Sequence, residues 1–210
     1  MKKKSPLSKQ PNFIVGVGAS AGGLNAFKDF ISKIPRDSGM TFILVQHLDP
    51  NHHSLLPELL QKVSSLPVVE IQDNLTIKPN KIYIIPSNKI LTIEAGFLKL
   101  KPRDEDKPAR QVLIDVFFKS LANEYADKAI GIVLSGTGRD GTEGLRNIKK
   151  LGGITFAQDT NSASWEDMPK NAVQAGVVDF VLSPETMAEK LEEIKNLLNL
   201  QENNIENLES

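Results

Sequence analysis

The chain has 210 residues, of which 40% are hydrophobic and 24% are charged, and its 25 basic residues nearly balance 26 acidic ones. This composition is typical of one soluble globular domain, and the charge balance argues against nucleic acid or an acidic membrane as a partner. No stretch approaches the ~20 apolar residues that span a bilayer, and the absence of cysteine excludes disulfides, a thiol nucleophile and a thiolate zinc site. We expect a cytoplasmic protein without membrane insertion.

Strand-like runs alternate with amphipathic helical patterns along the chain, which is typical of βαβ units. We expect one domain over residues 12–199, with flexible tails at 1–11 and 200–210. The fold class is therefore α/β, with a doubly wound, mostly parallel sheet and helices on both faces. In chain order, strands are predicted at 13–17, 41–46, 130–134, 154–157 and 178–182, and helices at 24–34, 55–63, 112–125, 141–151 and 184–198.

Residues 81–100 follow a different pattern. Short strand-like runs at 82–85, 90–93 and 97–100 are separated by turn residues. This spacing predicts a small antiparallel hairpin excursion from the parallel sheet. The charged, proline-containing segment 101–110 that follows is predicted to be a loop.

A glycine-rich turn with a single serine, Ser20, covers residues 16–23 directly after the first predicted strand. Two kinds of chemistry use such a strand-to-helix turn. One is a serine nucleophile held above a parallel sheet, as in G-x-S-x-G, and the other is a cradle of backbone amides for phosphate, as in G-x-G-x-x-[GA]. Both patterns match, so the turn alone does not decide between them.

Three chemically capable residues follow the carboxyl ends of predicted strands: Ser20, His47 and Asp140. The ligand crevice of open parallel sheets lies at that edge. A serine hydroxyl needs a base within hydrogen-bond reach and a third group that fixes the tautomer of the base, and histidine and aspartate supply both. The order Ser, His, Asp differs from the Ser, Asp, His of α/β-hydrolases, which indicates a convergent site on another doubly wound fold.

Each of these residues also has an ordinary structural interpretation. Ser20 can cap the following helix, and His47 can pair with a loop carbonyl. Asp140 with Glu143 three residues later resembles a capping box for the helix that begins between them. The triad hypothesis rests on all three residues falling at the same edge of the sheet, which the structural interpretations do not require.

Two further sites are weaker hypotheses. A dinucleotide site would use Gly16, Gly18 and Ala21, and would need an acidic residue at the end of the second strand, where the chain has His47 and places Asp49 only in the loop. A metal site can be drawn from clustered side chains after the second strand, but no distant partner ligand is evident. The side chains of that cluster are His47, Asp49, His52 and His53.

With these positions identified, the chain resembles the catalytic domain of the chemotaxis protein-glutamate methylesterases, the CheB family. The resemblance covers most of residues 12–198. Each motif alone is weak, but together they are specific. The matching segments are GASAGG at 18–23, VQH at 45–47, LSGTGRDG at 134–141, and Gln158-Asp159 followed by Met168-Pro169 and Ala172.

The resemblance implies an activity and a partner. Members of the family hydrolyse glutamate γ-methyl esters on chemoreceptor helices and often deamidate receptor glutamines, with no metal or organic cofactor. By the resemblance Ser20 is the nucleophile, His47 the base and Asp140 its orienter, and backbone amides at Ala21 and Thr137 form the oxyanion site. A methyltransferase domain or protein is the second partner that it implies.

The chain also departs from the family pattern. Many members carry threonine where this chain has Ala21, and methionine where it has Thr137. Two-component members carry an N-terminal receiver domain, whereas only 12 residues precede the first predicted strand. We expect a layout like that of methylesterase/methyltransferase hybrid proteins or of a stand-alone enzyme. The departures leave open a catalytically weak or inactive module that only binds a signalling protein.

Overall fold

The computed structural model describes residues 13–47, 54–103 and 112–208, with side chains described as far as Leu197. Its centre is a seven-stranded parallel sheet with strand order β10-β9-β8-β1-β2-β5-β3, and a three-stranded sheet of order β4-β7-β6 accompanies it. The predicted fold class is confirmed. The expected tail at residues 1–11, and Asp49, His52 and His53, lie outside the described residues.

The elements have the following bounds. The strands are β1 (Ile14–Ala19), β2 (Thr41–Gln46), β3 (Val68–Glu70), β4 (Leu75–Thr76), β5 (Lys81–Ile84), β6 (Lys89–Glu94), β7 (Phe97–Pro102), β8 (Ala129–Val133), β9 (Ile154–Gln158) and β10 (Phe180–Leu182). The helices are α1 (Gly23–Ser32), α2 (Leu56–Gln61), α3 (Leu113–Tyr125), the 3-10 helix η2 (Ala126–Lys128), α4 (Thr142–Lys150), α5 (Asp167–Gln174) and α6 (Pro184–Leu208).

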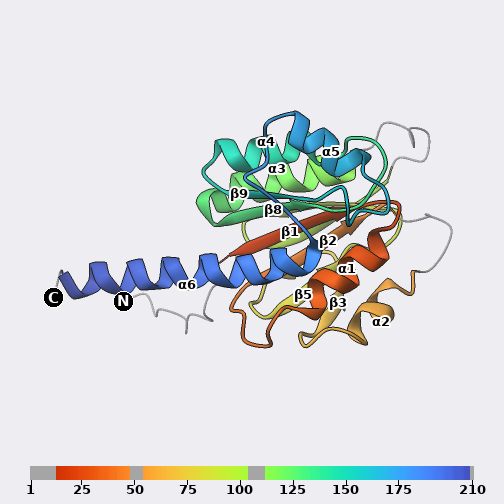
Figure 1. Ribbon diagram of the computed structural model, residues 1–210. Coiled ribbons are helices and arrows are strands. Elements are labelled where there is room, and N and C mark those ends of the chain that lie inside the picture. Colours follow the sequence, from red (N-terminus) through yellow and green to blue (C-terminus); the bar gives the residue numbers. More distant parts are fainter. Residues whose placement is uncertain (1–12, 48–53, 104–111, 209–210) are drawn as a thin grey trace.

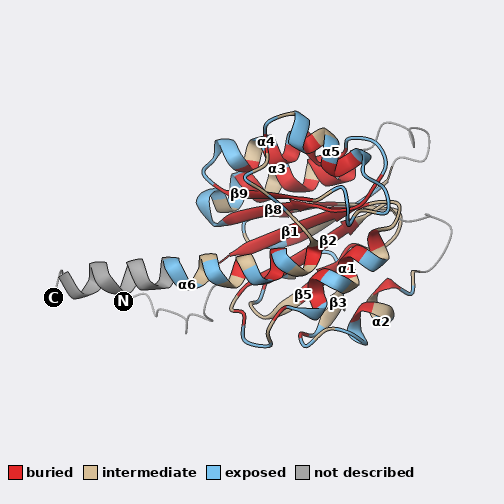
Figure 2. Cartoon of the chain, viewed as in Figure 1, coloured by how far each residue is buried: buried red, intermediate tan, exposed pale blue. Residues whose placement is uncertain are grey.

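Helices cover both faces of the large sheet: α3, α4 and α5 lie on one face, and α1, α2 and α6 on the other (Figure 1). Successive side chains of a strand point to opposite faces, so the central strands β1, β2, β5 and β8 each contribute to two hydrophobic cores. In β1, Ile14 packs in the core under α3 and α4, while Val15 and Val17 pack in the core under α1 and α6. The central strands of the large sheet and the inner sides of the helices are accordingly buried (Figure 2), whereas the edge strands β3 and β10 are partly exposed.

Two glycines of β1 let α3 approach the sheet closely. A Cβ atom on Gly18 would lie 2.4 Å from Cγ2 of Ile114, and one on Gly16 would lie 2.8 Å from Cε1 of Phe117. Both glycines are buried beneath α3, so they serve helix packing and leave no space for a cofactor phosphate. The close approach brings the first turn of α3 to the carboxyl end of β1.

The predicted antiparallel hairpin is β6 paired with β7, and β4 adds a third strand beside β7. The strand predicted at 82–85 instead belongs to the large sheet, where β5 pairs parallel with both β2 and β3. Its side chains explain this, because Ile82 and Ile84 enter one core and Tyr83 enters the other. A strand buried on both faces is typical of a parallel sheet.

Two helices differ from the sequence prediction. Helix α5 was not predicted, because Pro169 interrupts its first turn and only Met168, Pro169 and Ala172 are buried. A proline is tolerated there since the first backbone N–H groups of a helix have no partner within it. Helix α6 begins at Pro184 as predicted, with Thr186 N donating to the Ser183 hydroxyl at 3.4 Å, but it continues to Leu208, beyond the predicted end at 198.

Candidate active site

Ser20 lies in the turn between β1 and α1. Its amide donates to Ser135 O at 3.0 Å, and its carbonyl accepts from Gly23 N at 3.0 Å and from Gln46 Nε2 at 3.2 Å. Gly22, with φ 76°, forms the N-cap of α1 without a side-chain hydrogen bond. The interpretation of Ser20 as the helix cap is therefore wrong. Among the described residues its hydroxyl forms no hydrogen bond, and Ser20 remains partly exposed.

His47 lies next to Ser20 because β1 and β2 are neighbours in the sheet. The parallel register pairs Ala19 with Gln46, so Ser20 and His47 are each one residue beyond the last pair, and His47 N lies 3.4 Å from Ala19 O. The imidazole Nε2 of His47 lies 2.9 Å from Oδ2 of Asp140, with 27% of the histidine side chain and 8% of the aspartate side chain exposed. No hydrogen bond joins the Ser20 hydroxyl to His47 in the described part of the chain.

Asp140 is held by the first turn of α3, which precedes it in the sequence. Its Oδ2 accepts from Ile114 N at 3.0 Å, and its Oδ1 accepts from Asp115 N at 2.9 Å and from Gly141 N at 2.9 Å. The N-cap of α4 is Gly141, without a side-chain hydrogen bond. The predicted capping box with Glu143 is therefore wrong, because Asp140 caps a different helix.

Asp115 is a second buried carboxylate beside Asp140. Its Oδ1 accepts from Gly144 N in the first turn of α4 at 2.7 Å. Burial raises the pKa of the Asp115 carboxyl, and the negative charge of Asp140 raises it further, against the hydrogen bond from Gly144. The sequence analysis missed this residue. The sequence feature that could have identified it is a single acidic side chain within the apolar run Leu113–Phe118.

The turn after β8 is tied to the turn that holds Ser20. The Ser135 hydroxyl donates to Ala21 O at 2.9 Å, and Ser135 N donates to Oε1 of Gln158 at 2.8 Å. A Cβ atom on Gly136 would lie 2.2 Å from Sδ of Met168 and 3.0 Å from Cβ of Ser20, so only glycine fits there. The two glycine-rich turns thus form one packed edge. The sequence analysis named the second turn but assigned no role to Ser135 or Gln158.

Several backbone amides of the two glycine-rich turns have no acceptor among the described residues, including those of Ala21, Gly22, Thr137 and Gly138. Gly136 N, in the turn after β8, by contrast donates to Trp165 O at 3.0 Å. Ala21 is partly exposed and Thr137 is exposed, so solvent or a ligand can reach the segment that contains each amide.

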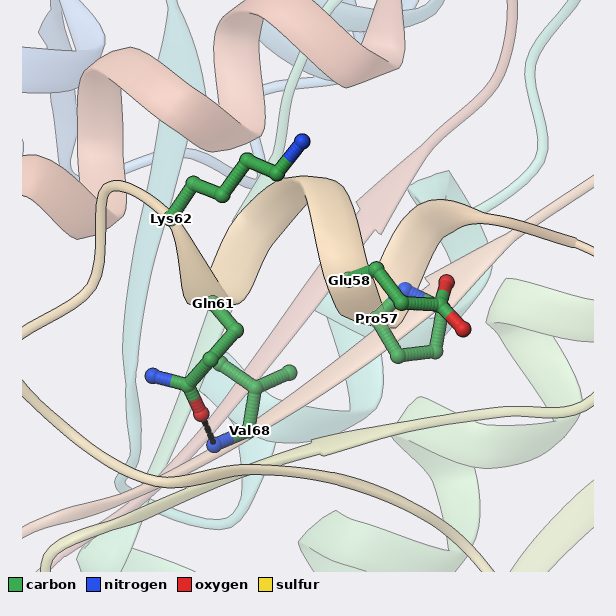
Figure 3. Close-up of a pocket in the computed structure, with 5 residues that line it drawn as sticks. All are labelled: Pro57, Glu58, Gln61, Lys62 and Val68. Carbon is green, nitrogen blue, oxygen red and sulfur yellow. Dashed lines mark hydrogen bonds between the residues drawn. The ribbon is translucent and has the colours of Figure 1, made fainter.

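A separate hollow lies at the edge of the sheet, between α2 and β3. It is lined by Pro57, Glu58, Gln61, Lys62 and Val68 (Figure 3). Gln61 Oε1 accepts from Val68 N at 2.9 Å, which occupies a donor of the outermost strand (Figure 3). None of the residues Ser20, His47 and Asp140 lines this hollow, and we assign no chemistry to it.

Within the described ranges, no group of three or more His, Asp or Glu side chains is arranged to bind a metal ion. His47 of the hypothetical metal cluster instead contacts Asp140. No helix of the described chain is both long and apolar enough to cross a membrane.

The geometry agrees with comparisons to known proteins. A family model described as CheB methylesterase matches residues 15–191. The chain belongs to the CheB methylesterase family. The crystal structure of the Thermotoga maritima CheB methylesterase catalytic domain superimposes with a TM-score of 0.79 at 31% identity, covering 87% of this chain and 98% of that one.

Curated relatives extend this assignment. A Leptospira interrogans protein, provisionally named a protein-glutamate methylesterase/protein-glutamine glutaminase, is 33% identical over 90% of this chain and 95% of its own length. A Syntrophus aciditrophicus protein with the same activity in its name is 32% identical over 88% of this chain but only 54% of its own length. CheB methylesterases therefore occur both at about the length of this chain and within longer proteins.

Proposed function

We propose that this protein is a cytoplasmic serine hydrolase that demethylates glutamate γ-methyl esters on chemoreceptor helices, with Ser20 as nucleophile, His47 as base and Asp140 as its orienter. The observation that carries the proposal is the 2.9 Å contact between Nε2 of His47 and Oδ2 of Asp140, beside the turn that holds Ser20. The names of the relatives support the same reaction and add deamidation of protein glutamines as a second activity.

The base is His47. Because its Nε2 faces a carboxylate, that nitrogen carries the proton and donates it, which leaves a lone pair on Nδ1. Nδ1 is thus the atom that accepts the Ser20 proton. Asp140 fixes this tautomer and stabilises the imidazolium. Backbone amides of two helix N-termini surround it and favour its negative charge.

The reaction proceeds in two halves. Ser20 Oγ attacks the γ-carbonyl carbon while Nδ1 of His47 takes its proton, and the amides of Ala21 and Thr137 bind the oxyanion. The intermediate collapses as the methoxy group takes the proton from Nδ1 and departs as methanol. Water then attacks the glutamyl-serine ester, Nδ1 takes its proton, and Ser20 leaves with that proton to release glutamate. A glutamine side chain follows the same course with ammonia as the leaving group.

The substrate of this reaction must be made by transfer of a methyl group to a glutamate carboxylate. A methyltransferase domain or protein is therefore the second partner that we propose, acting on the same receptor helices in the opposite direction. Ala21 and Thr137, which depart from the family pattern in their side chains, retain the backbone amides on which the mechanism depends.

The test is methanol release from a methylated receptor fragment. Ser20→Ala and His47→Ala should each lower kcat/KM by about 10³-fold or more while remaining folded. Ser32→Ala is the matched control, because that exposed serine bonds only Asp29 O at the end of α1. Demethylation by Ser20→Ala at the parental rate would exclude the assigned nucleophile. Failure of a serine-directed phosphonate to label Ser20 would instead favour a module that binds without catalysing.

A further inference from the structure

Trp165 is the single tryptophan of the chain, and it is 51% exposed. It lies between β9 and α5, in the loop that packs against both glycine-rich turns of the candidate active site. Isolated exposed apolar residues are common on protein surfaces and need no explanation. Trp165 differs from them because of how it is held and where it lies.

The backbone of Trp165 is fixed on both sides. Its N–H donates to the Ser135 hydroxyl at 3.0 Å, and its carbonyl accepts from Gly136 N at 3.0 Å. The Ser135 hydroxyl in turn donates to Ala21 O, so a chain of hydrogen bonds joins Trp165 to the residue after Ser20. The exposed indole is therefore carried on a rigid backbone.

The rest of the loop is equally well ordered by its own contacts. Asp159 Oδ1 accepts from Asn161 N at 3.0 Å and from Ser162 N at 3.1 Å, and Gln158 Nε2 donates to the Ser162 hydroxyl at 3.2 Å. On the other side, Met168 N donates to Gly136 O at 3.0 Å. A side chain presented on such a loop loses little conformational entropy when it binds a partner.

The indole lies beside the turn that holds Ser20. Cδ1 of Trp165 lies 3.2 Å from the position that a Cβ atom would take on Gly22, two residues after Ser20. Gly136, which binds the Trp165 carbonyl, places its own Cβ position 3.0 Å from Cβ of Ser20. A protein that delivers a side chain to Ser20 thus brings its neighbouring surface over Trp165.

We propose that Trp165 binds the protein part of the substrate, namely an apolar side chain one helical turn from the esterified glutamate. This inference rests on the proposed function. Side chains three or four residues apart on a helix are neighbours, ~5–6 Å between Cβ atoms, so an ester at Ser20 is accompanied by a second contact on the same helix face. Rigid, exposed aromatic side chains are typical anchors of protein interfaces. Trp165 therefore discriminates a helix-borne ester from a free one.

The kinetic test compares two substrates. One is a methylated two-helix receptor fragment, and the other is the free N-acetyl-glutamate γ-methyl ester amide. Trp165→Ala should lower kcat/KM for the fragment by about 10- to 50-fold, chiefly through KM, and change that for the free ester by less than about twofold. Trp165→Phe should recover part of the loss. An equal loss on both substrates would assign Trp165 a structural role, and no loss on the fragment would refute the contact.

A binding measurement separates this inference from the proposed function. Because Trp165 is the only tryptophan, the emission of the Ser20→Ala protein reports on its indole alone. Titration with the methylated fragment should shift that emission to shorter wavelength as the half-exposed ring is buried. Saturation seen by calorimetry with unchanged emission, or no binding at all, would overturn the contact. Failure of the wild-type protein to release methanol from the fragment would instead overturn the proposed function.

Discussion

The side chains of Asp115 and Asp140 each accept hydrogen bonds from the first turn of the other residue's helix. Asp140 precedes α4 but accepts hydrogen bonds from the first turn of α3, whereas Asp115 lies in that first turn and accepts from Gly144 N in the first turn of α4. Two helix N-termini therefore share two buried carboxylates. The contact between Asp140 and His47 depends on where α3 lies on the sheet as well as on the turn after β8.

Asp140→Asn should keep the fold and lose most activity. An asparagine has one acceptor oxygen and one NH2 group, so it presents a donor toward one of the N–H groups that now surround the carboxylate, and it cannot stabilise an imidazolium. We expect kcat/KM to fall by about 10²- to 10³-fold, less than in Ser20→Ala. Methanol release measures this. The exposed Asp127→Asn is the matched control, and equal activity in the two variants would contradict the role of Asp140.

Asp115→Ala should destabilise the protein by about 1–2 kcal/mol, because Gly144 N loses its buried acceptor. Asp115→Asn keeps an acceptor and should cost less.

The pKa of Asp115 is raised above 3.8 in the folded state, so folded protein binds more protons there than unfolded protein does. The free energy of unfolding should therefore fall, relative to Asp115→Asn, as pH rises through the range just above 3.8. Parallel profiles in urea unfolding would contradict this.

Gly18→Ala should lower activity because it displaces the first turn of α3, which holds Asp140. The new methyl group would lie 2.4 Å from Ile114, whose amide binds Asp140. Gly16→Ala is the control, since its methyl group would meet Phe117 and Leu121 farther along the helix. We expect both variants to lose about 1–3 kcal/mol of stability. Only Gly18→Ala should also lower kcat, by about tenfold, because small displacements of catalytic groups are costly. Equal kcat values in the two variants would exclude this coupling.

Asp179 stabilises the edge of the large sheet that β9 and β10 form. Burial alone would raise its pKa, but Lys149 Nζ at 2.6 Å and the Thr155 amide and hydroxyl at 3.0 and 2.8 Å hold the pKa of Asp179 below its usual 3.8. Its contribution is therefore present above pH 3.8 and is lost as pH falls through the lowered pKa. Asp179→Asn should cost about 1–3 kcal/mol near neutral pH, with kcat unchanged. Denaturant unfolding at neutral and strongly acidic pH measures this, and an undiminished difference in acid would contradict it.

Local patterns in the sequence were sufficient to predict the alternation of strands and helices, the parallel sheet, the β6–β7 hairpin and the family. Ser20, His47 and Asp140 were located at strand ends because a strand ends where its apolar run gives way to a turn, which is a property of neighbouring residues. Their roles as nucleophile, base and orienter remain predictions. The preference for hydrolase over dinucleotide chemistry likewise came from which residue follows the second strand.

Only the tertiary structure decided which partner each side chain has. The hydrogen bonds that Asp115 and Asp140 accept from the first turn of the other residue's helix join residues 25 to 29 positions apart, and the hydrogen bond from Ser135 to Ala21 spans 114 positions. Such contacts leave no periodic trace in the sequence, because they depend on how helices pack and not on local spacing. The same reason explains why the sequence assigned Asp140 to the wrong helix, placed β5 in the hairpin and gave no role to Trp165. The sequence by itself determined which residues reach the active edge of the sheet, and the packing of α3 and the loop before α5 determined what they contact there.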